Sequence, residues 1–425
     1  MMSHADSTRF APSFALVRAH FIAGIVGLCV FSGGLVKEAR FIQGQFFQPA
    51  LLGLVHLCVL GWLMPIAIGA LHELVPFVFE RRVGSERAAW GAFAMYVVGA
   101  VGFIAQMWVL RVGWLLAVAG TSVAVALWIY ALNFFATILS SKAKGSLTAI
   151  NIAASLVYLL AAVTLGAALA WNLCFPYLPG DHLALLRAHA HVAGLGFFGL
   201  LIMGVAYRLL EMFLLSHGAS ERAGFVAFVA INAALLMLIA TFVLDDAHRL
   251  LVPAAVAAAI GIVAFLAQVS AIVMRRMQRK IDVALGHTAT SFLYLATALW
   301  TGIGVAFLPT GSPLHDRMTL AYGLLFVPGF IGTIVIGQLY KIVPFLVWLH
   351  RFSPYVGLKK LPSASELLPE RPKQLQYLLM HAGLASLAVG VMVQSAALRT
   401  AGAVAFAASA ALVAGNLGFI DARRP

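Results

Sequence analysis

Two histidines separated by one residue open an apolar segment in the middle of the chain. His189 and His191 begin the stretch HAHVAGLGFFGLLIMGVAY. In an α-helix, residues i and i+2 point about 200° apart, so one metal ion cannot easily bind both imidazoles. Two cofactors flanking the helix would each take one histidine. Alternatively, one histidine binds a cofactor and the other forms a hydrogen bond.

The segment around these histidines recurs along the chain. When His56, His191 and Leu324 are superposed, glycine falls at offsets 5 and 13 in all three segments. Glycine fills only 38 of 425 positions, so two such columns are hard to ascribe to chance. The aligned residues are Gly61, Gly196 and Gly329, then Gly69, Gly204 and Gly337, then His72, Tyr207 and Tyr340. The pattern predicts three copies of one unit.

The repeat places His56 and His191 at equivalent positions, so we expect them at similar depth on parallel helices. Two neutral imidazoles on either side of a porphyrin iron form a low-spin b-type haem. The alternative is a hydrogen bond from each histidine to a neighbouring helix. His189 would bind a second haem or form an interfacial hydrogen bond. Arg187 would bind a haem propionate or reach toward lipid headgroups. The cofactor predicted is one haem b, or two.

The composition is that of a polytopic membrane protein. Hydrophobic residues make up 62% of the chain and charged residues only 10%, with a mean hydropathy of +0.97. A soluble protein is excluded, and the lipid bilayer is the first partner predicted. The net charge of +13 is explained by membrane topology, so nucleic acid is not expected as a partner.

Apolar runs long enough to cross a bilayer number twelve, and they predict an all-α membrane protein. Divided by the repeat, they give three four-helix units at approximately 14–140, 147–275 and 285–420 within one integral domain, residues 1–425. The aligned segments open the second, sixth and tenth helices. The polar stretch 351–373 is predicted to be a cytoplasmic linker between the tenth and eleventh helices.

The distribution of basic residues predicts the orientation. The termini and the loops after even-numbered helices carry 21 of the 28 Lys and Arg residues. By the positive-inside rule, both termini are cytoplasmic. The localisation predicted is a bacterial-type inner membrane. His56, His189 and His191 are then expected toward the outer face.

The H-x-H pattern, the glycine at offset 5, the aromatic residue at offset 16 and the histidine on the second helix resemble subunit I of the haem-copper oxidase superfamily. The resemblance is to its nitric oxide reductase and C-type oxidase branches. It implies that His56 and His191 ligate a low-spin haem and His189 a high-spin haem. The resemblance also implies twelve helices with threefold pseudo-repetition and cytoplasmic termini.

Two features differ from that superfamily. Its members carry H-x-H on the tenth helix, where this chain has Tyr322 and Leu324. The seventh helix, ERAGFVAFVAINAALLMLIATFVL, lacks the histidine pair of the copper centre, so copper is unsupported. The NnrS family, twelve-helix proteins tied to nitric oxide stress and reported to hold haem and copper, is similar in size and in lacking this pair.

The function predicted is an integral membrane b-type haem protein, redox or nitric oxide-related, and not a complete oxygen reductase. If it is an enzyme, it is a haem-dependent oxidoreductase. A diatomic ligand (NO or O2) and a redox partner or other subunits are expected. The alternatives are a transporter or assembly factor for copper, haem or another small molecule, and a non-catalytic membrane scaffold. His20 and His287, 267 residues apart, would form a second metal or haem site or hydrogen-bond near helix ends.

Overall fold

The computed structural model describes residues 13–141, 145–244, 247–278 and 281–425, and it contains no β-strand within these ranges. Twelve helical segments in these ranges are long and apolar enough to cross a membrane, as predicted. They are Phe14–Phe41 (α2, η1), Pro49–Phe79 (α3, η2, α4), Glu86–Trp108 (α5), Trp114–Leu139 (α6), Leu147–Cys174 (α7), His182–Leu214 (α8, η3, α9), Arg222–Val243 (α10), Leu251–Met274 (α11), Val283–Phe307 (α12), Pro313–Tyr355 (α13, η5, α14, η6, η7), Glu370–Met392 (α15) and Ala396–Ala422 (α16).

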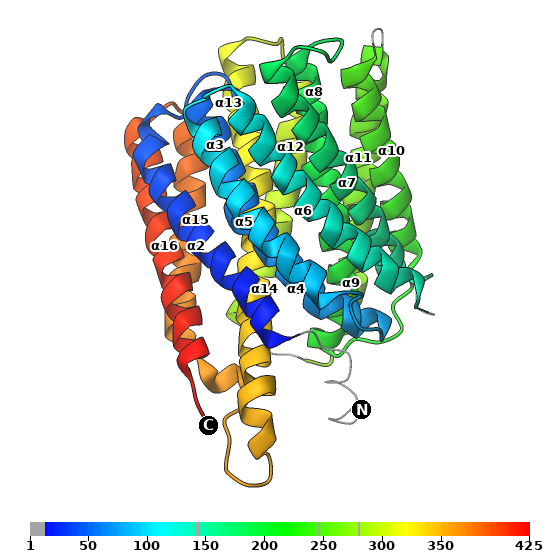
Figure 1. Cartoon of the computed structure of the whole chain (residues 1–425), viewed down its shortest axis with the longest axis vertical. Helices are drawn as coiled ribbons and strands as arrows, with labels where there is room; N and C mark the ends of the chain where they lie inside the picture. Colours follow the sequence, from blue (N-terminus) through cyan, green and yellow to red (C-terminus); the bar gives the residue numbers. More distant parts are fainter. Residues whose placement is uncertain (1–12, 142–144, 245–246, 279–280) are drawn as a thin grey trace. The chain divides into compact units, whose positions relative to one another are not determined.

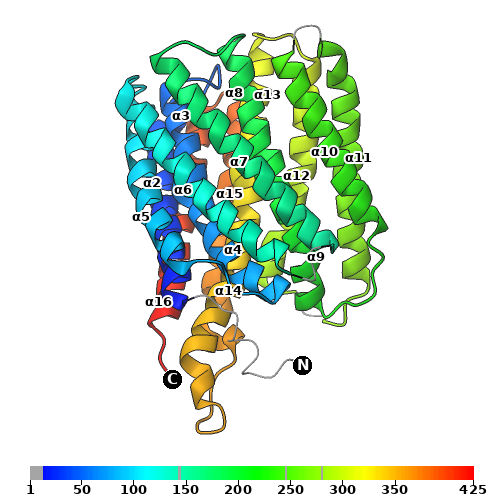
Figure 2. The same cartoon turned by 45° about the vertical axis from the view of Figure 1, so that its right-hand side comes forward.

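The chain divides into two compact units. The first unit is Ala70–Lys280, and the second combines Ser13–Gly69 with Ile281–Pro425. Within the first unit, α10 and α11 run side by side as a helical hairpin (Figure 2). Within the second, α15 and α16 form another hairpin (Figure 1). The second unit therefore combines the first spanning segment and most of the second, up to Gly69, with the last four.

Polar caps fix the starts of several helices. Ser85 and Ser146 accept hydrogen bonds from backbone N–H groups in the first turns of α5 and α7. Asp181 and Asp282 do the same for α8 and α12. Such caps satisfy amide groups that have no partner within the helix. The cap at Asp181 makes His182 the first residue of its helix.

The connection before α15 is shorter than the predicted linker 351–373. The π-helical η6 (Trp348–Phe352) and the short η7 (Ser353–Tyr355) extend the tenth segment, and α15 begins at Glu370. Between them lies η8 (Ala364–Leu367), closed by reciprocal bonds between Ser363 and Glu366. The hydrogen bonds from Ser363 hold the pKa of the Glu366 carboxyl below its ordinary value. Charge and proline content therefore overstate the length of this loop.

Candidate functional site

Each of the three aligned segments contains a π-helical stretch directly after its anchor residue, which is the residue used to superpose the segments. His56 ends α3 (Pro49–His56) and is followed by η2 (Leu57–Leu63). His191 ends α8 (His182–His191) and is followed by η3 (Val192–Gly199). Leu324 ends α13 (Pro313–Leu324) and is followed by η5 (Leu325–Gly332). Such wider turns occur frequently at functional sites, so they mark the surroundings of His56 and His191.

His56 and His191 are held by the same hydrogen bond. The Nδ1 atom of His56 lies 2.8 Å from the carbonyl oxygen of Leu52. The Nδ1 atom of His191 lies 2.8 Å from that of Arg187. A carbonyl oxygen only accepts, so each Nδ1 carries the proton and each Nε2 carries the lone pair. Metal-binding histidines usually donate their second ring nitrogen in this way. Both half-buried imidazoles therefore have the tautomer that an iron ligand needs.

His189 has the same tautomer through a different contact. Its Nδ1 atom donates to the carbonyl oxygen of Ala162 on α7, 3.0 Å away. The absence of a side chain at Gly166 admits the ring, because a Cβ there would lie 2.8 Å from His189 Cε1. The ring of His191 instead lies 5.4 Å from that of Phe242 on α10. The two histidines thus contact different helices, as their spacing predicts.

Filling the space at Gly166 is expected to displace His189. Gly166→Leu would break the bond to Ala162 and destabilise the first unit by about 1–3 kcal/mol. If His189 binds haem, the haem-to-protein ratio falls as well. Gly91→Leu is the matched control, because no atom lies within 4 Å of a Cβ built there. Equal unfolding midpoints and haem ratios for the two variants would contradict this prediction.

The glycines at offset 13 of the aligned segments each contact the preceding spanning helix at an equivalent place. A Cβ on Gly69, Gly204 or Gly337 would lie 2.9, 2.7 or 2.8 Å from the Cβ of His20, Asn151 or His287, respectively. Seven residues beyond Asn151 and His287, the rings of Tyr158 and Tyr294 contact Gly196 and Gly329. His287 thus occupies the place that Asn151 occupies in the first unit.

The structure brings His287 to a histidine that the sequence analysis did not pair with it. The rings of His287 on α12 and His381 on α15 have centres 5.2 Å apart. His20, its predicted partner, donates from Nδ1 to the carbonyl oxygen of Leu16 at 2.8 Å. Among the described residues, no group of three or more His, Cys, Asp or Glu side chains could hold a metal ion. No spacing in the sequence indicates this pair, because the contact of Tyr294 with His381 joins residues that are 87 positions apart.

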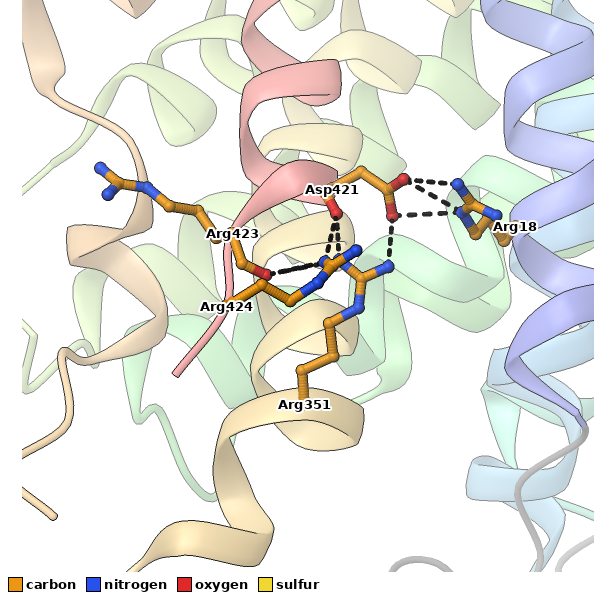
Figure 3. A network of polar contacts seen from close by, with 5 residues as sticks. All are labelled: Arg18, Arg351, Asp421, Arg423 and Arg424. Carbon is orange, nitrogen blue, oxygen red and sulfur yellow. Dashed lines mark hydrogen bonds and ion pairs between the residues drawn. The ribbon is translucent and has the colours of Figure 1, made fainter.

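Two arginine arrangements in the second unit were also missed. Figure 3 shows Asp421 at the end of α16 between Arg18 of α2 and Arg351 of η6, with Arg18 Nη2 2.7 Å from the carboxylate. Arg399 of α16 is 1% exposed. It donates to the carbonyl oxygens of Ala39, Arg40 and Gly390 at 2.8–3.2 Å. Both arrangements join helix ends, so we assign them to the scaffold.

Searches of the sequence against family models and against curated proteins give no match.

Proposed function

We propose that this chain is an integral-membrane b-type haem protein with His56 and His191 as the axial ligands of one haem. It passes electrons or binds a small diatomic ligand such as nitric oxide. The main support is that the two histidines have the same local environment. Each donates from Nδ1 to the carbonyl four residues earlier, and each directly precedes a π-helical segment.

The residues of the chain fit the needs of such a group. His56 and His191 would each offer an Nε2 lone pair to the haem iron. When bound, the iron supplies reversible one-electron chemistry. The carbonyls of Leu52 and Arg187 hold the rings in the required tautomer and keep the imidazoles electron-rich. The Arg187 side chain is assigned to a propionate. His189 is assigned to a second haem.

The proposal includes the finer architecture. Three four-helix units, at approximately 14–140, 147–275 and 285–420, build one membrane domain with both termini in the cytoplasm of a bacterial-type cell. The equivalent glycine contacts at His20, Asn151 and His287 support the repeat. Loss of the third anchor histidine, at Leu324, gives the third unit a different role. The resemblance to subunit I of the haem-copper oxidase superfamily supports the redox assignment.

A dithionite-reduced minus oxidised spectrum of the purified protein tests the proposal. A b-type α band is expected, with pyridine haemochrome giving the haem-to-protein ratio. His56→Ala and His191→Ala should each abolish the low-spin band, because a single imidazole does not complete the axial pair. Carbon monoxide or nitric oxide should shift the absorption bands of any haem with an open axial position.

A variant on the same spanning segment provides the control. His72 lies 16 residues beyond His56, about 24 Å along a helix that rises 1.5 Å per residue, and packs on the Tyr130 and Phe134 rings. His72→Asn should therefore keep the band. A folded preparation without haem, expressed with adequate haem supply, would refute the proposal.

A further inference from the structure

A second group of titratable side chains lies inside the second unit, between α12 and α15. The Tyr377 ring centre lies 4.9 Å from that of His287 and 4.3 Å from that of His381. Tyr294 stacks on His381 at 5.7 Å, and Tyr340 stacks on His287 at 6.3 Å. Three aromatic rings thus surround two imidazoles.

Each of these imidazoles has one nitrogen without a hydrogen-bond partner. His287 is 0% exposed, and its Nε2 lies 2.9 Å from Gln376 Oε1. The amide nitrogen of Gln376 donates to Ser409 Oγ at 2.9 Å, so Oε1 is the acceptor and His287 Nε2 the donor. His287 Nδ1 is therefore a buried lone pair. His381 Nδ1 lies 3.1 Å from the Tyr294 hydroxyl, and its Nε2 is buried without a partner. Such atoms need an explanation, such as a catalytic role or a bound water or ion.

The first unit contains the same arrangement built from amides. Asn151 contacts Gly204 as His287 contacts Gly337. The Tyr158 hydroxyl donates to Asn232 Oδ1 at 2.8 Å, where Tyr294 bonds His381. An amide therefore suffices for packing and for the tyrosine hydrogen bond. The imidazoles add only a titratable lone pair.

The distance between the two rings and the side chains around them decide between a haem iron, a divalent ion and a proton as the ligand. Metal–nitrogen bonds are about 2 Å long, so imidazoles on opposite faces of a haem iron would have ring centres about 6 Å apart. The observed 5.2 Å is too short. A divalent ion needs about four ligands and a compensating negative charge. Within the described residues, no third His, Cys, Asp or Glu joins the pair. The ligand that remains is a single proton.

The charged groups on the neighbouring helices are engaged elsewhere. Lys341 of α14 pairs with Asp282, and Lys373 pairs with Glu370 at 2.8 Å. Arg317 of α13 donates to the carbonyl oxygens of Pro313 and Met392, and Arg399 of α16 donates to carbonyls. The groups that face the imidazoles are thus the phenols of Tyr294, Tyr340 and Tyr377. Their ring faces stabilise a cation without neutralising it.

A cleft with several charged residues in its lining lies beside Tyr340, which stacks on His287. It has a volume of about 310 Å³, and Asp282, Lys341, Glu370, Lys373 and Tyr340 line it. The Tyr340 hydroxyl accepts a hydrogen bond from Asn416 Nδ2 at 2.9 Å, which leaves its own proton available for donation. Tyr340 therefore belongs both to the cleft and to the surroundings of His287.

We infer that His287 and His381 form a proton-binding site inside the second unit, supplied with protons from this cleft through Tyr340. A hydronium ion in the cleft releases its proton and becomes water. The proton forms an N–H bond at the lone pair of His287 Nδ1, the ring becomes an imidazolium, and no oxidant or reductant is required. This inference does not depend on the proposed haem.

Solid-state NMR of the full-length protein, labelled with 15N-histidine and reconstituted in liposomes, tests the inference. Between about pH 8 and about pH 3, a range wide enough for imidazoles buried away from water, one imidazolium signal is expected to appear from the pair. His287→Asn and His381→Asn should each abolish it. These variants copy the amides at Asn151 and Asn232, so the fold should be retained. Tyr340→Phe should slow its appearance after a pH jump by at least tenfold.

His20→Asn is the matched control, because His20 is also buried in the second unit, at 1% exposed. It should leave the pair's signal unchanged. If both rings stay neutral down to about pH 3 in the folded protein, or if the imidazolium survives either asparagine substitution, the inference is wrong. Haem content is measured on the same samples. A sample that lacks haem but keeps the imidazolium signal would contradict only the proposed function. A sample that keeps haem but lacks the signal would contradict only this inference.

Discussion

Replacing Gly27 by alanine is expected to destabilise the second unit by about 3 kcal/mol or more, near the upper limit for a single methyl group. A Cβ at Gly27 would lie 1.8 Å from the carbonyl oxygen of Gly61 and 2.2 Å from its carbonyl carbon. Both atoms belong to the backbone, so no side chain can rotate away. The helix α2 (Phe14–Glu38) and η2 would have to separate, and His56, five residues before Gly61, would move with them.

The same helix supplies the control for this substitution. Gly33 is exposed, and nothing lies within 4 Å of a Cβ built on it. Gly33→Ala should leave stability unchanged or raise it by about 0.5–1 kcal/mol, because alanine favours helix. Unfolding midpoints in detergent compare the two variants. A Gly27→Ala protein as stable as Gly33→Ala would show that the contact between α2 and η2 is not as close as described.

Arg399→Met is expected to cost about 3 kcal/mol of unfolding free energy. The guanidinium donates to Ala39 and Arg40 at the end of the first spanning segment and to Gly390 near the end of α15. A cation at helix C-termini also opposes the negative end of the helix dipole. Methionine preserves most of the volume but leaves three carbonyls without their donor, and buried acceptors without partners are costly.

The matched variant is Arg371→Met, which removes an exposed arginine from the start of α15 in the same unit. It should change stability by less than about 0.5 kcal/mol. Arg399→Lys should recover part of the loss, because an ammonium group retains the charge but cannot reach carbonyls in several directions at once. Equal unfolding midpoints for Arg399→Met and Arg371→Met would show that the hydrogen bonds of Arg399 do not stabilise the second unit.

The spanning segments could be predicted from sequence because the bilayer sets a minimum apolar length for all of them. A tight turn at Arg111 separates α5 from α6, and Leu110 beside it adopts a left-handed φ of 45°. The tautomers of His56 and His191 follow from helix geometry, because the donor and the carbonyl are four residues apart. These features depend on local rules, so they can be predicted from the spacing of residues in the sequence.

The other features depend on contacts between distant segments. His287 and Gln376 are 89 residues apart, and hydropathy does not indicate which face of α15 meets α12. Arg399 resembles an interfacial arginine in the sequence, yet its partners lie about 360 residues away. The widened turn after His56 is also hidden, because Leu57–Leu63 is an ordinary apolar stretch. For these residues, packing decides the structure and composition does not.

The widened turns at η2, η3 and η5 have a consequence for how such a chain can change over evolutionary time. A helix that accommodates one extra residue in a local bulge rotates all downstream side chains by about 100° relative to those upstream. Loss of a single residue from Leu57–Leu63 would restore an ordinary helix and turn the first part of the segment, with His56, away from its present direction. The three segments are therefore intolerant of single-residue deletions at places where the sequence itself looks unremarkable and replaceable.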